Sequence, residues 1–421
     1  MFVKTLFSIA LQSLWNRKTP ALLSILSISL SVVLLLGIER IRQSARSSFE
    51  STVSGVDLIV GARSGSVNLL LYSVFRIGNA TNNISNRTYN DLIENEHVEW
   101  MIPISLGDSH KGYKVIGTSN GYIQHYRYAG DKTLTLESDG TWIKDLYDVV
   151  LGAKVAQTLS YKVGDQIILS HGADAVSFQD HEDHPFTVKG ILKPTGTPVD
   201  SSLHISLKAM TALHKDWQEG APSAEDHMHA LTDADVEEAD ITAAFVKLTS
   251  KMQIFNFQRH INDYKAEPLM AILPGVSLSE LWQTLGWAEQ VLIFISFLVL
   301  LVSLLSMLIA LLSTLNERRR EMAILRASGA SKKFIFTLLV AESILLVILG
   351  SVLGIGFLYA GLGISKGILE SQLGLSLNLF KPTVIEGWYL LAIFGCALVA
   401  SLFPAWRAYR NSLADGLTIK V

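Results

Sequence analysis

Two long uncharged runs flank one short basic segment in the C-terminal half of the chain, and this pattern constrains the fold most. Residues 291–315 (VLIFISFLVLLVSLLSMLIALLSTL) contain no charged side chain, and residues 334–364 contain only Glu342. Apolar runs of about 18 residues or more predict membrane-spanning helices, because lipid offers no partner for exposed backbone N–H and C=O groups. Both runs are therefore expected in a bilayer, with the basic segment at one membrane surface.

Two further apolar runs, at about 21–38 and 387–403, bring the number of predicted spans to four. A composition of 49% hydrophobic and 17% charged residues, with a mean hydropathy of +0.33, indicates a membrane protein with a large polar part. The first run is short enough for a signal peptide to be the alternative. However, no small-residue cleavage site follows it, and GIERIRQSARSSFE continues as a helix-compatible segment.

The charge distribution predicts the orientation of these spans. The link at 316–333 is rich in Arg and Lys, and the positive-inside rule places it in the cytoplasm, so both termini are inside and 39–290 is outside. The segments 1–20, 316–333 and 404–421 have a net charge of +9 and the whole chain −3, so the remainder carries −12. An acidic outer domain argues against nucleic-acid binding.

The predicted fold is a membrane protein with four transmembrane α-helices and a large α+β extracytoplasmic domain between the first and second. The predicted segments are an amphipathic cytoplasmic-face helix (1–20), the first span and stalk (21–49), the extracytoplasmic domain (50–276), a second stalk and span (277–315), a cytoplasmic coupling helix (316–333), the third span (334–363), a short outer loop (364–386), the fourth span (387–403) and a cytoplasmic tail (404–421).

Alternating apolar residues and turn signals predict the elements of the outer domain. The expected strands are 56–62, 113–119, 148–156, 165–170, 186–192 and 243–250, and the expected helices are 85–96 and 206–217.

The cytoplasmic link has the pattern of a two-faced helix. Glu317 and Glu321 are four residues apart on one face, apolar residues occupy the other, and Gly329 suits a helix C-cap. Ser331 can then cap the third span. The alternative is an ordinary basic loop, which would not need this pattern.

Three stretches carry a resemblance to a known family. They are ERRREMAILRASGAS in the link, FPAWRAYRNSLADGL (403–417) after the last span, and VDLIVGARSGSVNLLLYSVFRIGNATNNI (56–84) at the start of the outer domain. Together with the four-span plan, they resemble the permeases of the MacB/FtsX-like class of ABC transporters, which has lipoprotein-release and macrolide-exporter relatives.

This resemblance implies a mechanical role. Members of the class form dimers, dock the cytoplasmic link on an ATPase, and transmit its motion through the first two spans and their stalks to the outer domain. The chain has no GxxxxGK[ST] phosphate loop, so ATP and Mg²⁺ are expected in a partner subunit and no cofactor in this chain. The docking role is carried over to Glu317, Arg318, Arg319, Arg320, Glu321, Arg326 and Gly329.

Two features of the third span are notable, a pair of glycines and one acidic residue. Gly350 and Gly354 form a GxxxG pattern, which predicts close helix packing. Glu342 is the only ionisable residue within that span and marks either an ion path or a structural position near the inner surface.

All eleven histidines lie between His97 and His260, and several stand beside carboxylates. Imidazole and carboxylate at short spacing suit Zn²⁺ or Cu²⁺, whereas solvated histidine-rich loops are the alternative. The candidate metal ligands are His171, His181, Asp183, His184, His227 and His229.

The sequence as a whole predicts the non-enzymatic membrane subunit of an ABC transporter in a bacterial inner membrane, since no nucleophile motif is present. Its expected partners are an ATPase, a second permease chain, membrane lipid, and a periplasmic adaptor, lipoprotein or outer-membrane protein. The expected substrate is a small toxic molecule, a lipoprotein or a metal-linked species. The alternative is a non-transporting signalling protein like FtsX that activates a cell-wall hydrolase.

Overall fold

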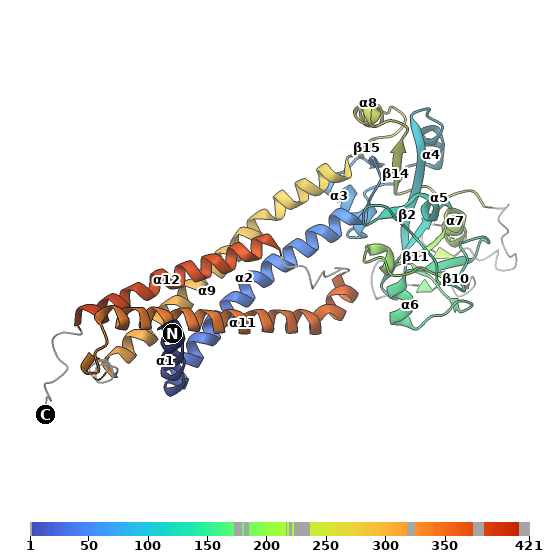
Figure 1. Ribbon diagram of the computed structural model, residues 1–421. Helices are drawn as coiled ribbons and strands as arrows, with labels where there is room; N and C mark the ends of the chain where they lie inside the picture. The colour runs from blue at the N-terminus through green and yellow to red at the C-terminus, as the bar shows by residue number, and fades with distance from the viewer. Residues whose placement is uncertain are drawn as a thin grey trace. The chain divides into compact units, whose positions relative to one another are not determined.

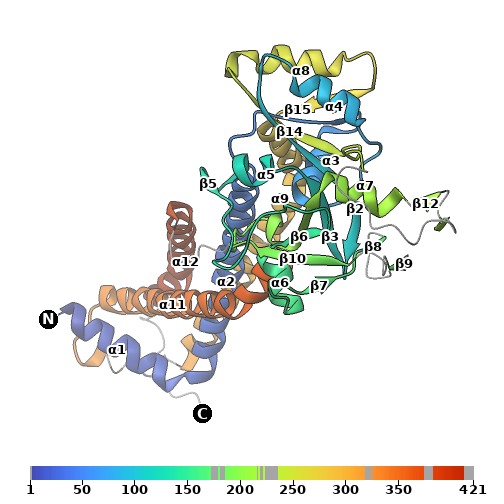
Figure 2. The same ribbon diagram turned by 90° about the vertical axis from the view of Figure 1, so that its right-hand side faces the viewer.

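The structure is a computed structural model that falls into two compact units. The first, here called the helical unit, comprises Met1–Gln43, Gly286–Gly367 and Leu377–Val421; the second, the sheet unit, comprises Ser44–Leu285 and Ile368–Ser376. Figures 1 and 2 show the chain from two sides. The residues described are 2–171, 179–180, 185–215, 217–218, 221–222, 236–317, 324, 326–373 and 383–411.

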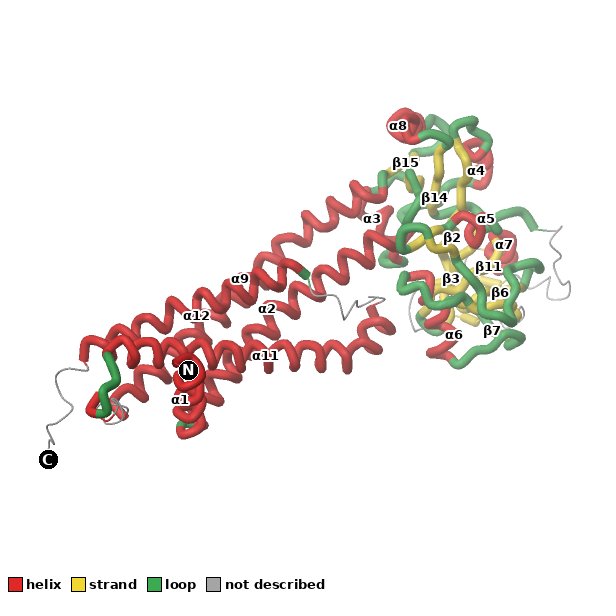
Figure 3. Tube along the Cα trace, in the orientation of Figure 1, coloured by secondary structure: helices red, strands yellow, loops and turns green. Residues whose placement is uncertain are grey.

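In the part of the chain that the structure describes, the helical unit is built from four long helices and one short one, which are drawn in red in Figure 3. Within the described residues, four helices are long and apolar enough to cross a membrane, as the sequence predicts. The short helix α1 packs Leu6 and Ala10 against α11. The helices are α1 (Phe2–Asn16), α2 (Lys18–Thr52), α9 (Pro274–Glu317), α11 (Lys332–Leu373) and α12 (Val384–Asn411).

Several of these helices extend beyond the boundaries predicted from sequence. Helix α9 begins at Pro274 rather than 277, with proline in the first turn, where its missing N–H costs nothing. Helix α11 continues to Leu373 through the first half of the segment predicted as an outer loop, 364–386. Helix α12 continues to Asn411, with Pro404 inside it. Apolar composition indicates only the part of a helix that lies in lipid. It therefore does not predict the polar ends of these helices.

The sheet unit contains one mixed β-sheet in the order β15-β1-β14-β2-β3-β11-β6-β10-β7. The pairs β3–β11 and β6–β10 are parallel, and the others along this order are antiparallel. The strands are β1 (Leu58–Ala62), β2 (Val98–His110), β3 (Tyr113–Thr118), β6 (Asp148–Leu151), β7 (Gln166–Ile167), β8 (Ser170–His171), β9 (Gln179–Asp180), β10 (Phe186–Ile191), β11 (Ser202–Ser206), β14 (Ala243–Leu248) and β15 (Leu269–Ile272), with the small pairs β4 (Arg127–Tyr128) with β5 (Lys132–Thr133) and β12 (Trp217–Gln218) with β13 (Ala221–Pro222).

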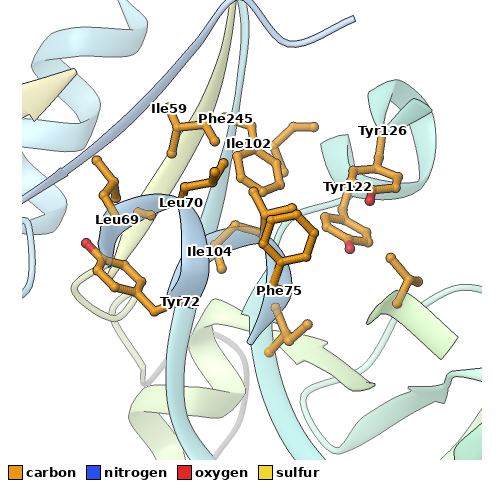
Figure 4. Packing of buried hydrophobic residues seen from close by; sticks show 14 of the residues in the cluster. Ile59, Leu69, Leu70, Tyr72, Phe75, Ile102, Ile104, Tyr122, Tyr126 and Phe245 are labelled. Atoms are coloured by element: carbon orange, nitrogen blue, oxygen red, sulfur yellow. The ribbon is translucent and has the colours of Figure 1, made fainter. Parts of the chain in front are cut away.

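Short helices cover both faces of this sheet. On one face, residues of α3, the π-helix and α5 form a core with alternate strand residues, as Figure 4 shows for Leu69, Tyr122 and Phe245. Gly61 allows this approach, because a Cβ there would lie 2.5 Å from Leu69 Cδ1. Two further cores lie under the other short helices. These elements are α3 (Ser66–Leu70), the π-helix (Leu71–Phe75), α4 (Asn86–Ile93), α5 (Gly121–His125), α6 (Ala153–Leu159), the 3₁₀ turn Pro198–Ser201, α7 (Leu207–Lys215), the 3₁₀ turn Lys251–Gln253 and α8 (Ile254–Asn262).

The edge strand β15 is fastened to helix α8. The backbone N–H of Ala271 donates to Asn262 Oδ1 (2.9 Å), and Gln258 Nε2 donates to the carbonyl oxygen of Ala271 (2.9 Å). Phe257 and Ile261 on the inner face of α8 are buried in the core beneath. Helix α8 is therefore held by both packing and hydrogen bonds.

Most of the predicted elements of the outer domain match observed ones. The strands predicted at 56–62, 113–119, 186–192 and 243–250 correspond to β1, β3, β10 and β14, and the two predicted helices to α4 and α7. The strand predicted at 148–156 is wrong in its second half: β6 ends at Leu151, and Gly152 starts helix α6. The segment 165–170 holds only the short strand β7 and the first residue of β8.

One of the buried polar side chains of the sheet unit is a histidine. His204 on β11 is fully buried between Tyr122 and Trp142, with ring centroids 5.2 and 6.1 Å away. Its Nδ1 lies 3.3 Å from the carbonyl oxygen of Val150. Burial, and to a lesser degree the charge of Arg76, lowers the pKa of His204 from 6.5 to about 3.

Stability should therefore fall as the pH falls from about 6.5 to about 3, because the unfolded chain binds a proton at His204 that the folded chain does not. One such proton contributes about 1.4 kcal/mol per pH unit. The stabilisation is complete above pH 6.5 and is lost progressively towards the folded pKa. Thermal denaturation of the His204→Phe variant across this range should show a shallower pH dependence than the native chain.

Candidate functional site

Helix α2 contacts each of the other three long helices of the helical unit, and these contacts form the candidate site, here called the α2 coupling site. The site links α2 to α9 through serines and a carboxylate, to α11 through glycines, and to α12 through a buried ion pair. Its residues are Ser31, Glu39, Arg40 and Arg42 of α2, Glu289 and Ser303 of α9, Gly350, Gly354 and Tyr359 of α11, and Glu386 of α12.

A pair of serines joins α2 to α9. The hydroxyl oxygens of Ser31 and Ser303 lie 2.7 Å apart, and Ser303 Oγ also lies 2.9 Å from the carbonyl oxygen of Ser27. Both serines are buried. Such a bond between membrane helices contributes about 0.6 kcal/mol on average, so it orients the pair more than it stabilises it.

Glycine lets the backbones of α2 and α11 approach closely. A Cβ on Gly350 would lie 2.8 Å from Ile28 Cβ, and a Cβ on Gly354 would lie 2.8 Å from the carbonyl oxygen of Ser29. Both separations are shorter than side chains tolerate. The GxxxG pattern thus places α11 directly against α2.

A buried ion pair joins α2 to the start of α12. The guanidinium of Arg40 forms an ion pair with Glu386 through Nε, donates from NH2 to Glu386 Oε2 (2.9 Å), and donates to Tyr359 Oη (2.9 Å). Arg40 is 6% exposed and Glu386 7% exposed. Two charges at this depth are stable only together, because each would otherwise be desolvated without compensation.

Glu386 also fixes the first turn of α12. The side chains of Thr383 and Glu386 form reciprocal bonds with each other's backbone N–H groups, both at 3.4 Å. This arrangement is a capping box, in which a threonine and a glutamate three residues later satisfy the free N–H groups of a helix start. Arg40 therefore binds a carboxylate whose position is already set by its own helix.

A second, more exposed group of charges joins α2 to α9. Arg42 donates to both carboxylate oxygens of Glu39 on its own helix, at 2.7 and 3.0 Å. Its NH1 lies 2.7 Å from Glu289 Oε1 on α9. The Arg42 side chain is 33% exposed, so solvent screens these interactions and they contribute less than the Arg40 pair.

The residues of the coupling site, apart from the two glycines, were not among the sites predicted from sequence. The sequence predicts a stalk after the first span, within 21–49, whereas Glu39 and Arg40 in this segment are buried. It predicts Glu386 in the outer loop 364–386, whereas Glu386 lies in α12. The spacing of Thr383 and Glu386, a hydroxyl followed three residues later by a carboxylate, was the one sequence signal that could have placed the helix start correctly.

The predicted ATPase-docking residues are only partly described. Arg318, Arg319, Arg320 and Glu321 lie outside the described residues, and Glu317 is the last residue of α9. Their docking role stays a prediction.

The described end of the link has the predicted capping geometry. Gly329 has a φ of +96°, which suits a helix C-cap, and Gly329 N–H donates to the carbonyl oxygen of Arg326 (3.0 Å). Ser331 Oγ accepts a bond from Phe334 N–H (3.2 Å) and so caps α11.

The predicted metal ligands are also mostly outside the described residues. This holds for His181, Asp183, His184, His227 and His229, while His171 belongs to β8 without a described side chain. Among the residues that the structure does describe, no group of three or more His, Cys, Asp or Glu side chains could hold a metal ion. The metal site stays a prediction.

Glu342, the ionisable residue of the third predicted span, is fully buried.

Two family matches cover most of the chain. Residues 21–263 match the MacB-like periplasmic core domain, and residues 293–413 match the FtsX-like permease C-terminal family. Curated protein sequences give no match. Among solved structures, the extracellular domain of the noncanonic ABC-type transporter YknZ from Gram-positive bacteria is similar at 14% identity and a TM-score of 0.30, covering 52% of this chain and 99% of that one.

The first family match alone spans more than half of the sequence, and the resemblance stated from the sequence is confirmed. Four candidate membrane helices and a mixed α/β domain between the first and second agree with this assignment. Permeases of this kind work with an ABC ATPase partner. The chain is a multi-pass membrane protein that belongs to the MacB/FtsX-like permeases of ABC transporters.

Proposed function

We propose that this chain is the membrane subunit of an ABC transporter that converts ATPase motion into motion of its sheet unit. The observation that carries the proposal is the continuity of two helices. Helix α2 runs without interruption for 35 residues and α9 for 44, and each contributes residues to both the helical and the sheet unit. A continuous hydrogen-bonded helix resists bending, so displacement at one end reaches the other.

Transmission of motion also requires that the helices move together, and the contacts of the α2 coupling site join them. The Ser31–Ser303 bond and the Arg42–Glu289 pair join α2 to α9, and both of these helices contribute residues to the sheet unit. The glycine contacts join α2 to α11, which follows the link, and the Arg40–Glu386 pair joins α2 to α12. A force applied to the link is therefore distributed over the whole helical unit.

In this proposal the link at 316–333 binds a separate ATPase in the cytoplasm of a bacterium, and the sheet unit lies outside the inner membrane. The excess of Arg and Lys in the link supports this orientation. Two copies of the chain form the working unit. The substrate is already outside the inner membrane when the sheet unit acts on it, and no path through the spans is required.

The ATPase-docking role is tested by replacing Arg318, Arg319, Arg320 and Glu321 with alanine together. Co-purification of the partner ATPase should be lost, while membrane insertion is retained, because the substitutions remove both charge signs from the proposed contact surface. The Lys332→Ala/Lys333→Ala variant is the matched control. It removes the same net charge of two from the start of α11 and should keep the ATPase.

Undiminished ATPase co-purification with the fourfold variant would contradict the docking role. The identity of the proteins that co-purify with the native chain also distinguishes a transport function from a signalling function. A membrane-fusion protein, an outer-membrane channel or a lipoprotein carrier would support transport, whereas a cell-wall hydrolase would replace the transport proposal with the signalling one.

A further inference from the structure

Helix α8 and the turn before it present two bare apolar side chains on one face. Met252 is 88% exposed and Phe255 is 69% exposed, the largest values for large apolar residues among the described part of the sheet unit. Their spacing of three residues, followed by Asn256 and Arg259, places all four on the same side of the helix. Single exposed apolar residues are common, but two neighbouring ones on a charged helix form a contact surface.

This face is held rigidly. The opposite side of α8 buries Phe257 and Ile261, and the hydrogen bonds of Gln258 and Asn262 fasten the helix to Ala271 of β15. The turn that carries Met252 is capped by Ser250 Oγ, which accepts from Met252 N–H at 3.3 Å. Binding of a partner here would therefore cost little conformational entropy.

The surroundings of the two apolar residues are basic. A shallow hollow beside them is lined by Arg259, His260 and Lys265 together with Asp263 and Tyr264. Lys251 adds another cation next to Met252. The chain outside the three basic segments of the predicted cytoplasmic side carries a net charge of −12, so this cationic patch contrasts with its own domain.

We propose that this α8 surface, formed by Met252, Phe255, Arg259 and Lys265, docks a separate protein whose contact site is an apolar hollow rimmed by carboxylates. Protruding Met and Phe side chains need a hollow to bury them, and arginine beside an aromatic anchor is typical of interface hot spots. Complementary carboxylates would steer the approach.

A second copy of the chain fits less well as the occupant. Two copies meeting symmetrically through this surface would bring like charges together, because the same basic patch would lie on both sides of the contact. The inference uses the proposed function only for the compartment, outside the inner membrane, in which the partner is sought.

The test places a photo-cross-linking amino acid at Phe255 of the full chain in cells that express it at native level. Val163, which is 38% exposed, is the control position elsewhere on the sheet unit. The protein cross-linked at 255 but not at 163 is identified by mass spectrometry, purified, and bound to the native chain in nanodiscs. The expected result is a soluble protein with an acidic contact region, whose affinity falls as salt rises.

Substitutions then show whether the captured protein uses this surface. Phe255→Ala and the pair Arg259→Glu/Lys265→Glu should each weaken its binding by about tenfold or more, since interface anchors of this kind dominate affinity. Ile93→Ala, an exposed apolar change on α4, should leave the affinity unchanged. Because Met252 and Phe255 are exposed, their replacement should not alter the melting temperature.

Cross-linking to a second copy, to lipid alone, or to nothing above the Val163 level would overturn the proposal, as would equal affinity for the Phe255→Ala variant. ATPase co-purification is measured on the same variants and should be unchanged. If the fourfold variant of the link keeps the ATPase, the docking role of the link is contradicted, but the proposal for the α8 surface is not affected.

Discussion

The Arg40→Met variant should be the least stable single substitution in the helical unit. It leaves the carboxylate of Glu386 buried without its cation, and breaking a buried ion pair in this way costs about 3–5 kcal/mol. Unfolding of the purified chain in mixtures of mild detergent and sodium dodecyl sulfate, followed by circular dichroism, measures the loss. Methionine keeps most of the volume of the arginine stem, so the change reports on charge rather than on a cavity.

The double variant Arg40→Met/Glu386→Gln should recover part of this loss, because no uncompensated charge remains. Glutamine is chosen since it can still accept a bond from the backbone N–H of Thr383 in the capping box. Glu289→Gln is the graded comparison: Glu289 and its partner Arg42 are each about one-third exposed, so breaking this contact should cost no more than about 1 kcal/mol. Equal stability of Arg40→Met and the native chain would show that the pair does not hold α2 to α12.

The Gly350→Leu variant should separate α11 from α2. A Cβ at this position would already lie 2.8 Å from Ile28 Cβ and Cγ2, so a larger side chain must push the helices apart or distort them. Overpacking of this kind costs about 1–3 kcal/mol, and sometimes more. The same detergent unfolding measures the stability, and ATPase stimulation by the assembled complex measures the coupling, which should fall with it.

Gly356 provides a matched control on the same helix. A Cβ there meets no heavy atom within 4 Å, so Gly356→Leu should leave both readouts near the native values. If Gly350→Leu and Gly356→Leu behave alike, close packing at Gly350 is not what joins the two helices.

Local patterns were sufficient to predict the membrane helices and the strands β1, β3, β10 and β14, whereas β2, β11 and β15 were not predicted. The uncharged run of α9 and the mostly apolar run of β14 each favour their own conformation within a short window. The same windows failed where two signals overlap. Residues 148–156 (DVVLGAKVA) are mostly apolar, and Gly152 marks the change from strand to helix.

The coupling site was out of reach for a different reason. Arg40 and Glu386 are 346 residues apart in the chain, and no periodicity within either segment indicates that they meet. Their burial follows from how α2 and α12 pack, which single-sequence reasoning does not supply. Helix α8 was not predicted, although Ile254, Phe257 and Ile261 recur at the spacing of an amphipathic helix.

The fastening of β15 to α8 bears on how other chains can bind the sheet. An unprotected outer strand invites a foreign peptide to extend the sheet through its backbone, a route to both ligand capture and aggregation. At Ala271 both outward backbone groups are already occupied by Asn262 and Gln258. Addition of a foreign strand is therefore blocked at this position. A protein that binds at this edge must contact side chains instead of the backbone, and side-chain contacts distinguish between partners better than backbone hydrogen bonds do.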